Sequence, residues 1–310
     1  MKISVLSLNP GIDRVMYLPS PLCAGHMNRL SKTVTSQGSK GANCAIMLKR
    51  LGCDIHYFSF TGGTYGEVCR SFTDREGINS TFIPAACGVR VNSKLIDGCG
   101  VCSELNEPGG PFTESELSAL TEAFEASGAD IYIMTGSLPR GASSGLYATV
   151  TARLKASGGT VVLDCSGKAL LEGLQSGPDV IKPNTDELAQ LCIDAGIGST
   201  DGIEAAAGGL YEKFPLGTLL VTDGGKGSYL FTNTHTGFCH PSDVVQHGFS
   251  GAGDCFLSGF VYAKYVCGMT DDDAHLFASC CGGAKVMLEG SLLPDRDNVT
   301  NIFNLRKASH

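Results

Sequence analysis

The feature of this sequence that most constrains its fold is the alternation of short apolar runs with longer helical patterns. The runs are rich in apolar and β-branched residues, as expected of buried strands. They cover residues 3–8, 55–60, 131–135, 161–164, 180–182, 219–222 and 229–231. Most are separated by stretches with apolar residues at helical spacing, which cover residues 42–51, 114–126, 145–156 and 202–214. This order predicts an α/β fold, in which a mainly parallel sheet is covered by helices on both faces.

Two segments, residues 12–35 and about 83–110, interrupt this alternation because they are rich in strand and turn residues and nearly free of helical patterns. In the second segment, the stretch VRVNSKLIDGCG has the alternation and the glycine turn of a β-hairpin. We therefore expect these segments to form a small separate sheet beside the main one. The 310 residues contain no linker long enough to separate independent domains, so residues 1–310 are expected to form one domain.

The formal net charge of −8 argues against binding to nucleic acid or to acidic membranes, because those surfaces attract basic proteins. An anionic substrate would therefore need a local basic pocket. No apolar run approaches the roughly 18 residues of a membrane-spanning helix. The start, MKISVLSLNPG, indicates a first strand rather than a signal peptide.

Fourteen cysteines are scattered through the chain, and only one pair, Cys99 and Cys102, has the CxxC spacing. Zinc sites of this kind need a second pair at matching spacing, so reduced thiols in a hairpin are favoured over a metal or redox centre. The adjacent Cys280 and Cys281 are expected inside a buried helix, since free cysteine behaves as a small apolar residue. This usage predicts a cytoplasmic protein in a reducing environment.

In open α/β sheets, ligands bind where the carboxyl ends of the strands meet the loops. The first such loop, in TSQGSKGANCAIMLKRLG, places Gly38 and Gly41 on either side of Lys40 before a helix, which suits an anion or a polar substrate. The second, GSLPRG, offers Arg140 to a phosphate. Each loop also has a purely structural explanation, a helix entry for the first and a proline turn for the second.

A third loop, KPNTDEL, places Asn184 and Glu187 three residues apart at a strand-to-helix junction, hence on one face of the helix. One amide oxygen and one carboxylate suit Mg²⁺, which keeps several of its waters; a capping box is the structural alternative. A fourth loop, VTDGGKGSY, is either a tight hairpin or a bed for the phosphates and ribose of a nucleotide. It is not a Walker A motif, because Gly227 rather than Ser or Thr follows Lys226.

The fifth loop, GFSGAGDCFLSGF at residues 248–260, contains a conflict. Its glycines open a helix, where free amides and the helix dipole favour an anion, yet Asp254 stands in the same turn and would repel phosphate. The loop lacks the third glycine of a dinucleotide-binding fingerprint. A loose nucleophile elbow around Ser250 also fits, but it needs an acid and then a histidine downstream. Asp273 and His275 stand too close together to supply them.

Together, the motifs GSKGAN, GSLPRG, KPNTDEL and GAGDCFLSG, in this order over nearly the whole chain, resemble those of the phosphofructokinase-B (ribokinase-like) carbohydrate kinases. The stretches LSLNPGIDR, MNRLSK, VRVNSKL and ELNEPGGPF look like the branch that holds 1-phosphofructokinase and tagatose-6-phosphate kinase. The resemblance implies a ribokinase-like fold in which segments 12–35 and 83–110 form a small β-sheet lid. It also implies that the lid closes over the sugar and joins two chains as a homodimer.

The resemblance resolves the conflict in the fifth loop, because in this family the aspartate of the GAGD loop is the catalytic base. Asp254 would accept the proton of the acceptor hydroxyl. The amides of Gly251, Ala252 and Gly253 would stabilise the phosphoryl group in transfer. The acid and the anion hole would then serve opposite ends of one in-line reaction. The helix dipole should also keep Asp254 ionised.

Other roles are implied by the resemblance, position by position. The residues that would hold the sugar hydroxyls are Asp13, Gly38, Lys40 and Asn43. The basic residues that would form the pocket for the sugar phosphate are Arg29, Arg90, Lys94 and Arg140. The residues that would bind ATP are Lys182, Asn184, Glu187, Asp223, Gly225 and Gly227, with parts of the 278–285 helix. Of these, Asn184 and Glu187 would hold Mg²⁺ through its water shell.

Two departures from the family pattern bear on the site. Ser39 stands where the family commonly has glycine, which requires a negative φ at that position. Gly248 and Phe249 stand where the family usually has a hydroxyl-bearing or acidic residue. The second departure concerns contacts to the nucleotide or to an activating monovalent cation, and it leaves Asp254 untouched.

The sequence therefore predicts an ATP-dependent, Mg²⁺-requiring kinase that phosphorylates a primary hydroxyl of a ketohexose phosphate. Fructose 1-phosphate, which would give fructose 1,6-bisphosphate, is the first choice of acceptor and tagatose 6-phosphate the second. Both carry a phosphate at one end and a primary hydroxyl at the other. A kinase of nucleosides or unphosphorylated sugars is disfavoured by the basic residues. Two hypotheses lie outside this class: a serine hydrolase that uses Ser250, and a sugar-binding protein without catalysis.

Overall fold

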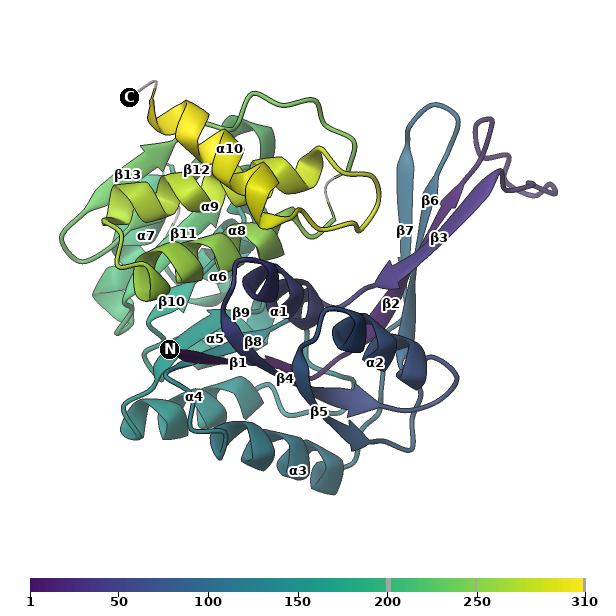
Figure 1. Cartoon of the computed structure of the whole chain (residues 1–310). Helices are drawn as coiled ribbons and strands as arrows, with labels where there is room; N and C mark the ends of the chain where they lie inside the picture. Colours follow the sequence, from purple (N-terminus) through teal and green to yellow (C-terminus); the bar gives the residue numbers. More distant parts are fainter. Residues whose placement is uncertain (199–201, 249, 309–310) are drawn as a thin grey trace.

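The computed structural model describes residues 1–198, 202–248 and 250–308. A large sheet flanked by helices carries a smaller sheet that projects from one side of it (Figure 1). The nine strands of the large sheet are, in spatial order, β13 (Thr236–Cys239), β12 (Ser228–Phe231), β11 (Thr218–Thr222), β10 (Val180–Ile181), β9 (Thr160–Asp164), β8 (Ile131–Thr135), β1 (Lys2–Ser7), β4 (Asp54–Thr61) and β5 (Asn79–Pro84). Neighbours from β11 to β5 pair in parallel, while β12 and β13 are antiparallel. The predicted mainly parallel sheet is confirmed.

Helices cover both faces of the large sheet, as the alternation predicts. The helices that contribute to the first apolar core are α1 (Lys40–Arg50), α8 (Ala252–Val261), α9 (Asp271–Val286) and α10 (Arg296–Lys307). Those of the second core, on the other face, are α3 (Glu114–Glu125), α4 (Leu146–Ala156), α5 (Gly167–Leu174), α6 (Thr185–Asp194) and α7 (Ile203–Lys213). Helix α2 (Gly66–Arg75) packs on β4 and β5. A single π-helical stretch, η2 (Tyr262–Val266), continues α8, and the 3-10 turn η1 (Gly224–Lys226) joins β11 to β12.

The continuous apolar runs of the sequence arise because the strands are buried on both faces. In β1, Ile3 and Val5 enter the first core, whereas Leu6 and the following Leu8 enter the second, and all four are 0% exposed. Successive side chains of a strand point to opposite faces. Each such side chain contributes about 1.5–3 kcal/mol when fully buried, so both helical layers are held by the same strand.

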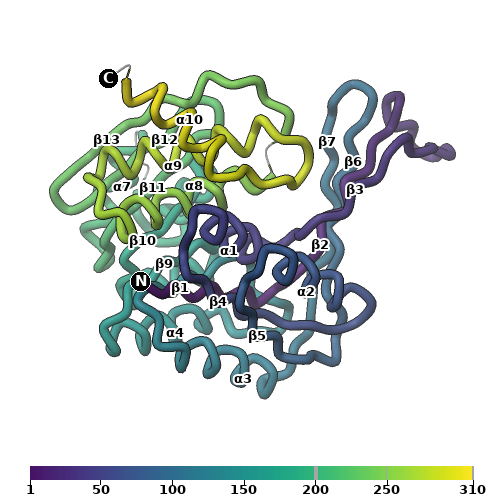
Figure 2. The backbone as a smooth tube through the Cα atoms, viewed as in Figure 1, coloured from purple at the N-terminus to yellow at the C-terminus, as the bar shows by residue number. Residues whose placement is uncertain are grey.

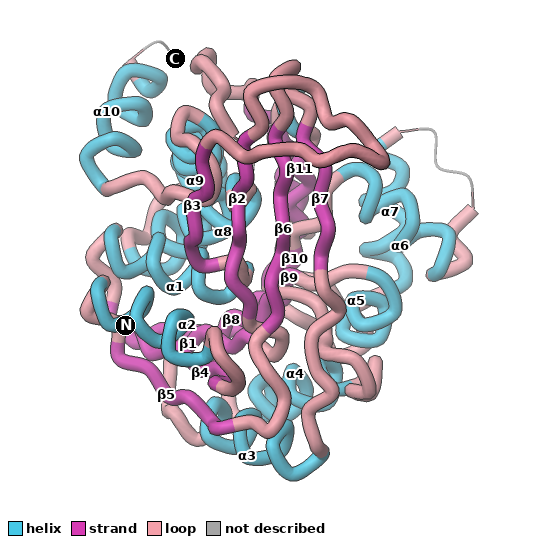
Figure 3. The backbone as a smooth tube through the Cα atoms, turned by 90° about the vertical axis from the view of Figure 1, so that its right-hand side faces the viewer, coloured by secondary structure: helices cyan, strands magenta, loops and turns pink. Residues whose placement is uncertain are grey.

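The small sheet combines two segments that are far apart in the sequence, as predicted from 12–35 and 83–110. Its strands are, in spatial order, β3 (Lys32–Gln37), β2 (Gly11–Tyr17), β6 (Arg90–Ile96) and β7 (Cys102–Asn106). Strands β2 and β6 pair in parallel at its centre, and β6–β7 is the predicted hairpin. Figure 3 shows this sheet face-on in front of the large one. Ile83 and Pro84, at the start of the second segment, pair instead with β4 in the large sheet.

The path of the chain brings six elements to the carboxyl ends of the strands of the large sheet (Figure 2). Strand β1 leads directly into β2, and the carboxyl ends of β9, β10 and β11 lie at the same edge. Helices α1 and α8 begin there as well.

All fourteen cysteines carry free thiols, with Cys280 and Cys281 buried in α9 as predicted. Within the described ranges, none of the helices has the length and apolarity needed to span a bilayer.

Candidate active site

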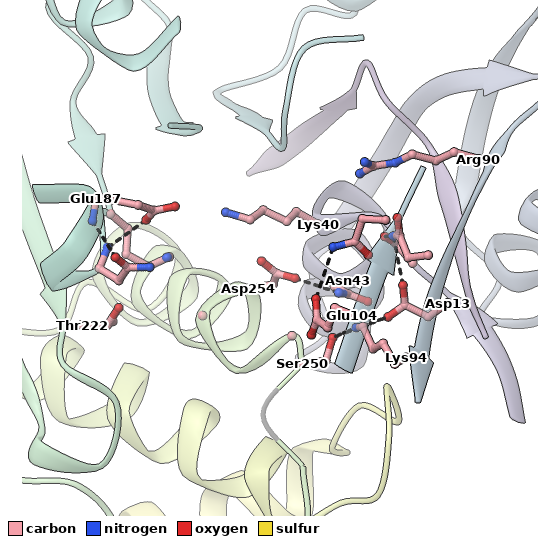
Figure 4. A pocket seen from close by; sticks show the side chains of 17 residues that line it. Asp13, Lys40, Asn43, Arg90, Lys94, Glu104, Glu187, Thr222, Ser250 and Asp254 are labelled. Atoms are coloured by element: carbon pink, nitrogen blue, oxygen red, sulfur yellow. Dashed lines mark hydrogen bonds and ion pairs between the residues drawn. The ribbon is translucent and has the colours of Figure 1, made fainter. Parts of the chain in front are cut away.

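A cavity of about 530 Å³ lies between the carboxyl edge of the large sheet and the small sheet (Figure 4). The residues predicted from the sequence that line it are Asp13, Gly38, Lys40, Asn43, Arg90, Lys94, Lys182, Asn184, Glu187, Gly251, Gly253 and Asp254. The lining residues to which the sequence analysis gave no role are Asn92, Glu104, Asn106 and Thr222, and Ser250, which it considered as a nucleophile, lines the cavity as well. Ala252 begins α8 between the two lining glycines. The motifs of the first, third and fifth loops therefore meet at one site.

Besides Ala252, five predicted residues do not line this cavity. Arg29 and Arg140 are exposed, the first in the loop between β2 and β3 and the second in the turn after β8. Asp223, Gly225 and Gly227 form the turn after β11, in which the amide of Asp223 donates to the carbonyl of Gly227 at 2.9 Å. The tight hairpin is thus the observed form of the fourth loop. Of the four basic residues proposed for the sugar phosphate, one chain brings only Arg90 and Lys94 to the cavity.

Asp254 lies in the first turn of α8, whose N-cap Gly251 has a φ of 87°. Its side chain is 5% exposed, and its Oδ2 accepts a hydrogen bond of 2.7 Å from Nδ2 of Asn43. Within the described part of the chain, no side chain or amide donates to its Oδ1. Asn43 therefore orients the carboxylate and leaves one oxygen to the cavity.

Burial raises the pKa of Asp254, and Lys40 is the strongest opposing influence. The sequence analysis expected the helix dipole to keep Asp254 ionised, and burial acts on its pKa in the opposite direction. Desolvation disfavours a charged carboxylate, and here it outweighs the nearby positive charges. A raised pKa makes a carboxylate a stronger proton acceptor, which suits a general base.

Asp164, at the carboxyl end of β9, connects the lysines of the site and was missed by the sequence analysis. Its Oδ2 lies 3.5 Å from Nζ of Lys40, and its Oδ1 lies 3.4 Å from Nζ of Lys182. The hydroxyl of Thr135 donates to Oδ2 at 3.0 Å. Burial alone would raise the pKa of Asp164, but Lys182 and Lys40 lower it below its usual value. The available signal was a carboxylate that ends an apolar strand at the ligand-binding edge.

Asp13, on β2, is the centre of a buried network on the small-sheet side. Its Oδ2 lies 2.6 Å from Nζ of Lys94 and accepts from the hydroxyl of Ser291 at 2.7 Å. Its Oδ1 accepts from Nδ2 of Asn92 at 3.1 Å. Nζ of Lys94 also contacts the hydroxyl of Ser250. The network joins β2 and β6 of the small sheet to the loops before α8 and after α9.

Arg90, on β6 of the small sheet, keeps a buried donor without a partner among the described residues. Its Nη1 donates to the carbonyl of Glu107 at 3.2 Å, while its buried Nε has no hydrogen-bond partner among the described residues. Burial lowers the pKa of Arg90. The same side chain lines a second cavity of about 180 Å³ beside the first. An unpartnered buried donor is costly, so this position fits an anionic ligand.

Asn184 and Glu187 form the capping box of α6, which was the structural alternative, and they line the cavity too. The amide of Glu187 donates to Oδ1 of Asn184 at 2.7 Å, and the amide of Asn184 donates to Oε2 of Glu187 at 2.9 Å. Oε1 of Glu187 accepts no hydrogen bond from the described residues. One free carboxylate oxygen beside an already engaged amide fits a magnesium ion held through its waters.

The two departures from the family pattern have structural consequences. Ser39 has a φ of −107° and caps α1, since its hydroxyl accepts from the amide of Ala42 at 3.2 Å. Its required negative φ is therefore confirmed. Gly248 packs against the turn at Leu288, whose carbonyl would lie 2.9 Å from a Cβ at position 248. Phe249 lies outside the described residues.

The nucleophile-elbow hypothesis has no support in this geometry. Ser250 contacts Lys94 and lies 3.5 Å from Asp13, and among the described residues no histidine contacts it. His275 is instead 2.8 Å from the hydroxyl of Ser228, and burial lowers its pKa to about 4. Ser250 therefore lacks the histidine base that activates a nucleophilic serine.

Known proteins resemble the chain over nearly its full length. Residues 6–297 match the pfkB family of carbohydrate kinases. Relatives named 1-phosphofructokinase include one from Vibrio cholerae, 28% identical over 97% of this chain and 94% of its own, and one from Haloferax volcanii, 29% identical over 96% and 95%. The fold matches phosphofructokinase-2 from Escherichia coli in complex with potassium, with a TM-score of 0.90 at 22% identity over 99% of both chains.

The family match and the relatives named 1-phosphofructokinase define the class of this protein, a phosphotransferase with a hydroxyl acceptor. Its fold is the ribokinase-like α/β fold. The chain belongs to the pfkB family of carbohydrate kinases.

Proposed function

We propose that this protein transfers the γ-phosphoryl group of ATP to a primary hydroxyl of a ketohexose phosphate, with fructose 1-phosphate as the first choice and tagatose 6-phosphate as the second. The observation that carries this proposal is the placement of Asp254. Its one free carboxylate oxygen faces the cavity, between Lys94 and Arg90 on one side and Glu187 on the other (Figure 4). The naming of the curated relatives supports the choice of fructose 1-phosphate.

The reaction follows from this arrangement. The acceptor hydroxyl gives its proton to Oδ1 of Asp254 as its oxygen forms a bond to the γ-phosphorus. The bond from that phosphorus to the bridging oxygen breaks, and ADP leaves. The first amides of α8 stabilise the charge that spreads over the phosphoryl oxygens. Lys40, whose pKa Asp164 raises, adds a permanent positive charge beside them.

The two ends of the cavity take the two substrates. Arg90, with its unpartnered Nε, is the anchor for the phosphate already present on the sugar. The carboxylate of Asp13 would accept hydrogen bonds from the sugar hydroxyls, and the side-chain amide of Asn43 would donate to them. At the other end, Asn184 and Glu187 would hold Mg²⁺ through its waters, beside Lys182 and Thr222. The ion supplies charge neutralisation and a template for the ATP phosphates.

The small sheet supports the proposal of a lid and a homodimer. Five of the thirteen exposed large apolar side chains in the described ranges lie on it or on its loops: Leu22, Met27, Leu30, Val101 and Leu105. Such a cluster is typical of an interface, and we propose a second copy of this chain as its occupant. Analytical ultracentrifugation over a series of protein concentrations should show a dimer, and the substitution Leu105→Asp should dissociate it. A wild-type monomer at all concentrations would contradict the proposed dimer.

The free thiols support a reducing compartment such as the cytoplasm.

The first experiment measures ADP release with Mg-ATP and each of fructose 1-phosphate, tagatose 6-phosphate, fructose 6-phosphate and fructose. One sugar phosphate should turn over, and Asp254→Asn should lower kcat about 10³-fold, within the range of general-base contributions. The matched control is Asp273→Asn, which removes a first-turn carboxylate of α9 that pairs with Lys307 away from the cavity. It should leave kcat unchanged.

Two outcomes would contradict the proposal. If Asp254→Asn retains more than a tenth of the activity while the wild type turns over a sugar, Asp254 is not the base. If no sugar stimulates ADP release although ATP still binds, the kinase proposal fails and the hypothesis of a sugar-binding protein without catalysis is favoured. Turnover of free fructose in preference to its phosphates would move the substrate outside the proposed class.

A further inference from the structure

Lys285, near the end of α9, is a buried cation that the proposed reaction does not use. Its side chain is 0% exposed, and within the described ranges no carboxylate lies within 4 Å of its Nζ. Its hydrogen bond is to the carbonyl of Gly290, at 3.0 Å. Burial lowers its pKa. Burying a charge without a carboxylate partner costs folding free energy, so we asked what the Lys285 ammonium group does at this position.

The carbonyl that Lys285 binds belongs to a turn that follows α9 and lies between two other parts of the site. Gly290 has a φ of 55°, which residues with a side chain rarely adopt. A Cβ at this position would lie 3.6 Å from Val15 on β2. The carbonyl of Val286 accepts from the amide of His247 at 2.7 Å, in the loop that leads to α8. Lys285 thus holds the centre of a turn that lies between the small sheet and the entry to α8.

The residue after Gly290 connects this turn to the sugar end of the cavity. Ser291 is 3% exposed, and its hydroxyl donates to Oδ2 of Asp13 at 2.7 Å. Its carbonyl accepts from Nε2 of Gln37, which also donates to Oδ1 of Asn43 at 3.2 Å. Asn43 in turn orients Asp254. One peptide unit therefore separates the carbonyl bound by Lys285 from the serine that fixes Asp13.

We propose that Lys285 is a positioning residue for sugar binding, which holds the Gly290 carbonyl and thereby places the Ser291 hydroxyl on Asp13. Without the ammonium group the turn loses a charge-assisted hydrogen bond inside the core, and Ser291 is no longer held at the carboxylate. Asp13 would then remain paired with Lys94 but would be poorly oriented toward a sugar hydroxyl. This role rests on the proposed function, because it assigns Asp13 to the sugar.

The test compares Lys285→Met, Ser291→Ala and the double variant with the sugar phosphate that the wild type turns over. Each single variant should raise the KM for the sugar about tenfold, as expected for one charge-assisted hydrogen bond, with the KM for ATP within twofold of wild type. If Lys285 acts through Ser291, the double variant should also show about tenfold rather than hundredfold. Lys264→Met is the matched control, since it removes a part-buried lysine of η2 that pairs with Asp271.

Hydrogen exchange provides a second readout that needs no substrate. In Lys285→Met, the amides of β2 around Asp13 should exchange faster than in wild type, whereas those of β9 should not change. If the wild type turns over no sugar, the proposed function fails, and the exchange measurement still decides whether Lys285 positions β2.

Three kinetic results would overturn the positioning role. They are an unchanged sugar KM in Ser291→Ala, effects that multiply in the double variant, and equal losses for sugar and ATP. Ser291→Ala removes a single hydroxyl and decides the matter if Lys285→Met does not fold. Unchanged exchange in β2 would overturn the role as well.

Discussion

The two ends of the cavity are built in different ways. At the proposed sugar end, Asp13 is 3% exposed and is held by Asn92 and Lys94 from β6 and by Ser291 from the turn after α9. At the proposed nucleotide end, Asn184 and Glu187 hold each other within one helical turn, and both hydrogen bonds between them are solvent-exposed. The first end is a tertiary network and the second is a local motif.

This difference indicates which end is preorganised. Buried charges in a low-dielectric environment keep their geometry only when each is paired, so we expect the proposed sugar end to be the more rigid of the two. In the proposed reaction, the exposed capping box leaves Glu187 free to take part in a water-mediated ion site. Asp254 and Lys40 line the cavity between the two ends, and Asp164 pairs with Lys40 there.

The largest expected effect is at the sugar end. In Lys94→Met the carboxylate of Asp13 stays buried without its cation, and breaking such a pair typically costs about 3–5 kcal/mol. We expect a loss of about 3 kcal/mol in the free energy of unfolding by urea, since Asn92 and Ser291 still donate to Asp13. Sugar turnover should fall below a hundredth of wild type while ATP still binds.

The matched control for Lys94→Met is Lys155→Met, which removes a lysine 2.7 Å from Asp179 where both side chains are about one-third exposed. Exposed pairs contribute roughly 0–1 kcal/mol, so this variant should be nearly neutral. Equal losses in the two variants would show that the sugar end is no more tightly built than an ordinary surface pair.

The next effect concerns the groups between the two ends. Burial raises the pKa of Asp254 and Lys40 opposes that shift, so Lys40→Met should raise the pKa further. The base is active when ionised, hence activity is lost as the pH falls through this pKa. The acid limb of the kcat/KM profile should therefore lie above pH 3.8 in the wild type and move to higher pH in the variant. We also expect kcat to fall about 10²-fold, as when one charge-stabilising donor is lost.

A limb that stays in place in Lys40→Met would mean that Lys40 does not influence the base. Lys168→Met is a suitable control, because its lysine is exposed on α5 and pairs with Glu172. The control should leave both the limb and kcat unchanged.

The smallest effect is expected at the nucleotide end. Glu187→Gln removes the carboxylate charge but keeps an oxygen that can accept the hydrogen bond from the amide of Asn184. The apparent affinity for Mg²⁺, measured by ADP release at fixed ATP, should fall about tenfold, as for other residues that contact a metal through its bound ligands or waters. The sugar KM should stay within twofold. Glu204→Gln, a first-turn glutamate of α7, is the matched control. A large change in sugar KM would show that the two ends are coupled.

Local features of the chain were predictable because they depend on neighbouring residues. The alternation of runs identified the α/β fold, and buried strands such as β1 explain why it did so. The capping box of α6 and the glycine that opens α8 are set by residues within one turn. The resemblance of the motifs added the order of the site along the chain and the role that we propose for Asp254.

The sequence by itself therefore determined the fold class, the family and the loops that meet at the site. Only the tertiary structure decided which charges converge there: Arg90 and Lys94 line the cavity, whereas Arg29 and Arg140 remain exposed. It also brought Asp164, Ser291 and Lys285 into the network. The physical reason is that electrostatics and desolvation depend on distance and burial in three dimensions, and neither can be read from spacing along the chain.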